Sequence, residues 1–71
     1  MTDTELLKDA IRKSGLKMQF VAEQLDLSYQ GLNNKINNRS EFKTSEIQKL
    51  CNLLFLGVED REQIFFANRV D

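Results

Sequence analysis

Apolar residues along the chain recur at the three- and four-residue spacing of an amphipathic helix, and no segment alternates with the two-residue period of a half-buried strand. The pattern predicts five short helices, over about residues 4–14, 18–25, 29–37, 44–55 and 60–66. We therefore expect an all-α fold around one core. The positions expected to face that core are Leu7, Ala10, Ile11, Val21, Ala22, Leu25, Leu32, Ile36, Ile47, Leu50, Cys51 and Leu54.

The predicted helix ends coincide with residues that favour capping. Gly15 can adopt the left-handed conformation that ends the first helix, and Asn37 and Asn38 can end the third. Ser28 is a strong N-cap for the third helix. The other predicted caps are Thr2, Asp3 or Thr4 for the first helix, Thr44 or Ser45 for the fourth, and Asp60, with Gln63 three residues later, for the last.

Length and composition exclude several classes of protein. The chain has 71 residues, which is one small domain. It has no His and one Cys, so it can form no internal disulfide, no Ser–His or Cys–His catalytic pair and no ordinary zinc site. We expect a binding module without cofactor or metal rather than an enzyme. The chain has no apolar run long enough to cross a membrane and no signal-peptide pattern, and its unpaired Cys fits a reducing cytoplasm.

The charges are spread unevenly along the chain. The net charge is −1. Residues 17–45 carry four basic and three acidic side chains, whereas residues 46–71 carry three basic and five acidic ones. The middle of the chain is therefore mildly basic and its C-terminal part is acidic.

The segment Met18–Asn37 has the pattern of a helix-turn-helix, in which two short helices pack at a steep angle and the second enters the major groove of DNA. Ala22 is the small residue needed where the helices cross, Leu27 follows the turn, and Leu32 faces inward. The outer face of the second helix is rich in amides, which are weak helix formers but can make paired hydrogen bonds to adenine. The residues on or beside this face are Tyr29, Gln30, Asn33, Asn34 and Asn37, flanked by Lys17, Lys35, Arg39 and Lys43, which can reach phosphates.

The run LKMQFVAEQLDLSYQGLNNKINNRSEF, residues 16–42, resembles the helix-turn-helix of the lambda-repressor/Cro superfamily, and IQKLCNLLFLG fits that family's fourth helix. The resemblance extends over about residues 4–58 and is nearest to the small Cro-like and modulator-of-repression (antirepressor) proteins of temperate phages of Gram-positive bacteria. It implies a single helix-turn-helix domain, 1–71, with a core at 4–58 and a short C-terminal helix and tail at 59–71. It also implies base contacts from Tyr29, Gln30, Asn33 and Asn34, and phosphate contacts from Lys17, Met18, Gln19, Asn37 and Arg39.

Three positions depart from the family pattern. Met18 stands where many members have a Gln that contacts the DNA backbone, and Asp26 stands where the turn usually has Gly. The inward-facing residue late in the third helix is Ile36, one place later than usual, with Lys35 in the usual position. The register of the recognition helix is therefore open by one residue.

Two functions follow from the resemblance. In the first, the protein is a Cro-like regulator of a lysis–lysogeny switch that binds double-stranded operator DNA in the bacterial cytoplasm, as a homodimer on half-sites roughly 34–36 Å apart. In the second, it is an antirepressor that binds the phage's main repressor and blocks the repressor's own contact with DNA. A near-neutral, amide-rich surface suits either a protein or DNA bases.

The C-terminal part of the chain has more large apolar residues than a small core needs. Phe65 and Phe66 are adjacent, and neighbouring residues on a helix point about 100° apart, so one ring is expected to pack inward and the other to be partly exposed. We therefore predict a partner interface that includes Phe65, Phe66 and Val70.

Overall fold

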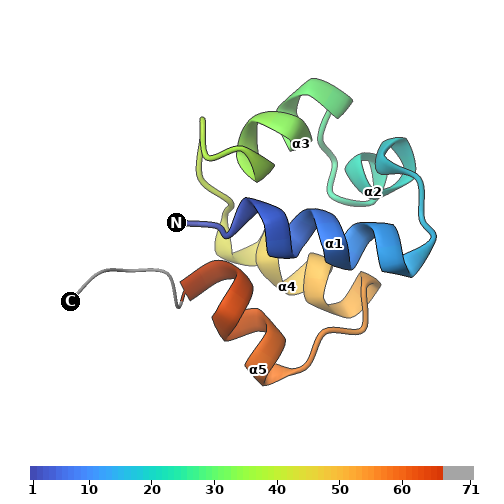
Figure 1. The fold of residues 1–71 in the computed structure, drawn as a ribbon. Coiled ribbons are helices and arrows are strands. Elements are labelled where there is room, and N and C mark those ends of the chain that lie inside the picture. Colours follow the sequence, from blue (N-terminus) through green and yellow to red (C-terminus); the bar gives the residue numbers. More distant parts are fainter. Residues whose placement is uncertain (67–71) are drawn as a thin grey trace.

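The fold is all-α, as predicted. The computed structural model describes residues 1–66, which form five helices and contain no strand. They are α1 (Thr4–Ser14), α2 (Met18–Gln24), α3 (Tyr29–Ile36), α4 (Thr44–Leu53) and α5 (Val58–Arg61), the last continuing without a break into the π-helical segment η1 (Glu62–Phe66). Figure 1 shows α1 crossing in front of α4, with α2 and α3 at the upper edge and α5 below.

The helices enclose one hydrophobic core. Its most deeply buried side chains come from four helices, so each of these helices contributes to one shared core. Leu32 and Ile36 of α3 are fully buried, which confirms the predicted inner face of that helix and settles its register. The other fully buried large side chains are Leu7 of α1, Val21 of α2 and Leu50 of α4.

Most predicted helix ends are confirmed. Asp3 caps α1 by accepting a hydrogen bond from the Leu6 N–H, and Gly15 ends it in the left-handed conformation, φ 77°. Ser28 caps α3 through its hydroxyl, which accepts from the Gly31 N–H at 2.9 Å. Asn38 has φ 64°, the left-handed conformation expected after α3.

Two predicted starts and one predicted end are wrong. Lys43, not Thr44 or Ser45, precedes the first turn of α4, because the Glu46 carboxylate reaches back and accepts from the Lys43 N–H at 2.8 Å. The last helix begins at Val58 rather than Asp60, whose carboxylate accepts from the Gly57 N–H at 3.3 Å. In each case the acidic residue belongs to the first turn and is not the cap. Helix α4 ends at Leu53 rather than near Phe55.

Cys51 of α4 is buried, as predicted for a small core residue. Burial raises the pKa of its thiol because the thiolate would lose its solvation there. The thiol therefore stays protonated at neutral pH and is a poor nucleophile.

Candidate nucleic-acid interface

A tight turn joins α2 to α3. Ala22 is completely buried, and its carbonyl accepts the Leu27 N–H at 2.9 Å, which closes the turn. Asp26, at the position where the resembling family has Gly, takes the left-handed conformation with φ 58°. An Asp tolerates this conformation better than most residues, so the turn keeps its geometry without a glycine.

Gly31 has a local role in the first turn of α3. A Cβ on Gly31 would lie 3.1 Å from the Ser28 Oγ, which is closer than an ordinary contact. The same Oγ accepts the hydrogen bond from the Gly31 N–H. The glycine therefore gives the capping hydroxyl room, and it bears on the helix start rather than on a ligand.

The outer face of α3 is a surface of uncharged polar groups. Tyr29 is about half exposed (49%), Gln30 and Asn37 are exposed, and Asn33 and Asn34 are partly buried. The Gln30 Nε2 donates to the Asn34 Oδ1 at 3.2 Å, one turn along the helix. This bond orients the two amides and leaves the other polar atom of each without a hydrogen bond among residues 1–66. The pair thus presents one donor group and one acceptor group side by side. We call these five residues the α3 amide face.

Three exposed cations precede or follow the α2–α3 pair in the chain. Lys17 precedes α2, while Arg39 and Lys43 lie in the segment between α3 and α4. All three are exposed, and none forms an ion pair with another residue in the described part of the chain. Three of the predicted phosphate contacts therefore keep an exposed charge, one before α2 and two after α3 in the chain.

Lys35, also predicted to contact phosphate, is instead part of a buried ion pair. Its Nζ lies 2.6 Å from the Glu46 Oε1, and only 12% of the Lys35 side chain is exposed. Burial alone would raise the pKa of Glu46, but hydrogen bonds from Lys35 and from the Lys43 backbone outweigh it and the pKa is lowered. The Glu46 carboxylate therefore stays charged at neutral pH, and its ion pair with Lys35 holds α3 against α4 rather than offering a cation to DNA.

Met18 and Gln19, the two predicted phosphate contacts at the start of α2, differ in exposure. The Met18 side chain packs against the hydrophobic core, so its thioether is not directed to a phosphate. Gln19 is exposed on the same first turn of α2. Gln19, and not Met18, therefore has a side chain that can reach a ligand.

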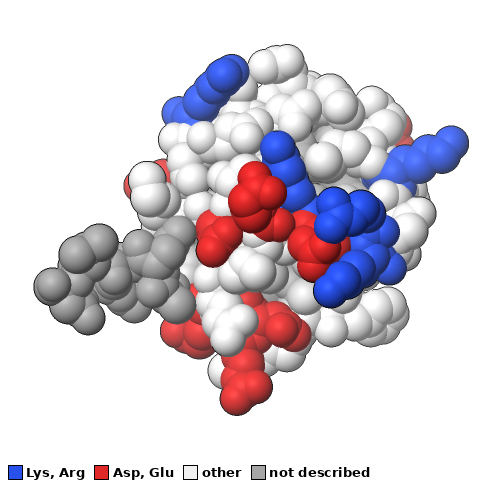
Figure 2. Space-filling view, viewed as in Figure 1, with Lys and Arg blue, Asp and Glu red and all other residues white. Residues whose placement is uncertain are grey.

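Charge on the visible surface follows the helices. In Figure 2 the upper part, over α2 and α3, is mostly white with basic groups towards its edges. Acidic groups gather over the start of α1 and around α5 below. The largest group of basic side chains in this view lies over the later part of α1, so an anionic ligand is disfavoured chiefly at the α5 end.

A family model matches residues 3–68, and its description reads "Protein of unknown function (DUF739)". The chain belongs to this family. No curated protein and no solved structure matches the chain. The match spans every helix of the DUF739 chain described above, including the α2–α3 pair and the residues around it. Within residues 1–66, no helix is long and apolar enough to cross a membrane.

The predicted C-terminal interface needs correction. Phe65 is 3% exposed and packs edge-to-face against Phe42 with ring centroids 5.7 Å apart, so it belongs to the core of this chain. Phe66 is partly exposed and lies under the Arg61 guanidinium at 5.7 Å. One ring inward and one partly outward is what the helical spacing predicted. Val70 lies outside the described residues.

A connection between the N-terminus and α3 was missed by the sequence analysis. The Asn38 side chain accepts from the Thr2 N–H at 2.9 Å and donates to the Thr2 carbonyl at 2.8 Å, and the Thr4 hydroxyl donates to the Ile36 carbonyl. The Asp3 N–H bonds the Ile64 carbonyl at 2.6 Å. Residues 2–4 therefore tie the end of α3 to η1. The signal was the pair of Asn residues after α3, which we interpreted only as helix terminators.

Proposed function

We propose that this DUF739 protein is a phage-type transcriptional regulator of a lysis–lysogeny switch that binds double-stranded operator DNA with α3 in the major groove. The observation that carries the proposal is the α3 amide face, which is uncharged, at least partly exposed, on a short helix after a tight turn, and preceded and followed in the chain by cations that form no ion pair among residues 1–66. Such a face has no role in the core, since Leu32 and Ile36 supply the packing of the helix.

The chemistry of the face suits base edges. A side-chain amide can donate to and accept from the N7 and N6 positions of adenine at once, and the Gln30–Asn34 pair holds one donor and one acceptor in register. Tyr29, at the start of the helix, is placed to contact a thymine methyl or a phosphate. Sequence preference would then come from the first two turns of α3.

The electrostatic contribution per chain is small. With Lys35 engaged by Glu46, the exposed cations beside the face are Lys17, Arg39 and Lys43. Three neutralised phosphates correspond to a slope of about −3 in log affinity against log salt. Binding by one chain is therefore expected to be weak, and two chains on adjacent half-sites roughly 34–36 Å apart would double the slope.

The experiment is selection of bound duplexes from a random-sequence library, followed by fluorescence anisotropy of the selected duplex at several salt concentrations. We expect the selection to enrich a sequence motif. We also expect the magnitude of the salt slope to decrease by about one for each half-site when Arg39 is changed to Ala. Lys49→Ala on α4, where Lys49 faces Asp26 at 3.6 Å, serves as the matched control and should leave the slope unchanged. The absence of any enriched motif would refute the proposal.

The acidic surface around α5 and the pairing of Lys35 favour a second candidate, an antirepressor that binds the phage's main repressor. Few cations and a neutral α3 face suit a protein partner, and an acidic surface would steer a basic repressor towards it. Gel shifts of an early-promoter duplex with the repressor, with and without this protein, separate the two. Release of the repressor from DNA without a shift by this protein alone would support the antirepressor.

A further inference from the structure

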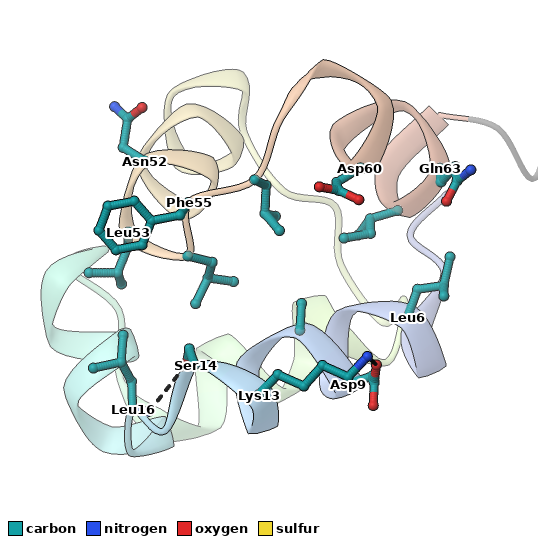
Figure 3. Close-up of a pocket in the computed structure, with 14 residues that line it drawn as sticks. Leu6, Asp9, Lys13, Ser14, Leu16, Asn52, Leu53, Phe55, Asp60 and Gln63 are labelled. Atoms are coloured by element: carbon teal, nitrogen blue, oxygen red, sulfur yellow. Dashed lines mark hydrogen bonds and ion pairs between the residues drawn. The ribbon is translucent and has the colours of Figure 1, made fainter.

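A groove of about 800 Å³ lies between α1, the end of α4 and the α5–η1 helix, away from the α3 amide face. Figure 3 shows α1 along one side and the α4–α5 connection along the other, with side chains of both directed into the space between them. Neither α2 nor α3 contributes a residue to it. Its apolar lining comes mainly from Leu6, Ala10, Leu16, Leu53, Leu54 and Leu56.

Phe55 stands at the rim of this groove with 93% of its surface exposed. Its backbone has φ 56°, a conformation that a bulky side chain rarely adopts. The two other non-glycine residues with positive φ among residues 1–66 are Asp26 and Asn38, whose side chains tolerate it. The left-handed conformation of Phe55 itself ends α4, since the Leu56 N–H donates to the Cys51 carbonyl at 2.9 Å. At the equivalent ends of α2 and α3 this position holds a short polar residue, so the exposed aromatic ring at Phe55 points to a contact that covers it.

We propose that the groove and Phe55 form the interface between two copies of this chain, with Phe55 of each copy inserted into the groove of the other. A two-fold symmetric contact requires a surface that is complementary to itself, which means a protruding group and a cavity on the same patch. Phe55 and the groove are adjacent on one patch and meet this requirement.

The charged groups on the rims agree with such a pairing. Lys13 and Asp9, 3.0 Å apart, lie on the α1 side of the groove, and Asp60 lies on the opposite side. If the two-fold axis runs along the groove, the α1 rim of one copy lies over the α5 rim of the other copy. Lys13 of one chain then faces Asp60 of its partner, whereas an axis across the groove would place each rim over the same rim of the other copy and leave Asp60 without Lys13 opposite it. The same rotation brings Phe55 over the α1 side of the partner's groove, where Leu16 lies.

This inference does not depend on the proposed function. The interface leaves both α3 amide faces uncovered, so association and DNA binding use separate surfaces and can fail separately. If DNA is the ligand, the dimer supplies the two recognition helices that a two-part operator requires.

Sedimentation equilibrium of the full chain and of Phe55→Gly and Phe55→Ser variants tests the interface. Glycine adopts positive φ without strain, so Phe55→Gly should keep its helical circular dichroism and melt no lower than the wild-type monomer. We expect the wild type to dimerise and both variants to have a dimer Kd raised at least about tenfold. Phe20→Ser, which removes another partly exposed ring on α2, is the control and should dimerise normally. A wild-type chain that stays monomeric at about 1 mM, or a Phe55→Gly variant that dimerises normally, would overturn the proposal.

Charge reversal tests the register of the pair. Lys13→Glu and Asp60→Lys should each weaken dimerisation, and the double variant should restore it towards the wild-type Kd. If the double variant is weaker than either single variant, these two side chains do not face each other and the two-fold arrangement along the groove is wrong.

Discussion

At the scale of single residues, the ion pair between Lys35 and Glu46 has the largest consequence for the site. Glu46 accepts from both the Lys35 Nζ and the Lys43 N–H, so one carboxylate holds α3 and the start of α4 together. The pair is nearly enclosed, with 12% and 9% of the two side chains exposed. It therefore helps to hold α3 in its orientation, and it engages a cation that would otherwise be free on the surface of that helix.

Glu46→Gln should lower the free energy of unfolding at pH 7 by about 1.5–3 kcal/mol, because a neutral amide replaces the charged acceptor of Lys35. Urea denaturation followed by circular dichroism measures the change. Glu41→Gln, which removes a charge from an exposed residue with no ion pair among residues 1–66, should change stability by less than about 0.5 kcal/mol. Equal effects of the two substitutions would contradict the assigned role of Glu46.

The same pair predicts a dependence of stability on pH. Because the pKa of Glu46 is lowered in the folded chain, its contribution is present above the unfolded value near 4.5 and is lost as the pH falls through the folded pKa. Stability of the wild type should therefore fall below about pH 4.5, and more steeply than that of Glu46→Gln. The pKa of Asp9 is lowered as well, through its hydrogen bond to Lys13, but this pair is exposed and its effect should vanish in high salt. Identical acid curves for wild type and Glu46→Gln in high salt would disprove the assignment.

At the scale of elements, the α2–α3 pair depends on the close approach of the two helices at Ala22. Its methyl group is fully buried, and the carbonyl of the same residue closes the turn to Leu27. Ala22→Leu should therefore separate the helices and cost about 1–3 kcal/mol through overpacking. Thermal denaturation measures this. An unchanged melting temperature for Ala22→Leu would place the crossing elsewhere.

The N-terminal segment is a second element that positions α3. Asn38→Gly removes both side-chain hydrogen bonds to Thr2 while keeping the left-handed backbone that this position requires. We expect faster hydrogen exchange of the Asp3 amide, whose bond to Ile64 depends on the placement of residues 2–4. The Gly31 amide, bonded locally to Ser28, is the internal reference and should not change. Protection of Asp3 that equals the wild type would show that Asn38 does not hold this segment.

The sequence predicted the features that depend on local physics. Helical spacing and the caps at Gly15 and Ser28 were enough to place α1 to α3 within a residue or two, and the spacing of Leu32 and Ile36 gave the face of α3 that is buried. Partners far apart in the chain could not be predicted in this way. Lys35 lies 11 residues from Glu46 and the Phe65 ring packs on Phe42, and both contacts exist only once the helices have packed. The strained conformation of Phe55 likewise leaves no mark on the hydrophobic pattern.

At the scale of the whole molecule, the fold separates two surfaces. The α3 amide face with its cations occupies one end, and the groove with Phe55 lies away from it against α1 and α5. The second surface has acidic groups around α5 and basic groups at the later part of α1 (Figure 2). We propose that the domain binds its ligand with the first surface and associates with a second copy through the other.

The most direct test of the account is the sequence-selective effect of Asn34→Ala. Anisotropy titrations would compare the wild type, Asn34→Ala and the control Gln48→Ala, an exposed amide on α4, on a selected duplex and on a random duplex. If the α3 amide face reads bases, Asn34→Ala should lose about 1–3 kcal/mol on the selected duplex, little on the random duplex, and the control should match the wild type on both. An equal loss on the two duplexes, or no loss on either, would contradict the central claim that this face recognises DNA sequence.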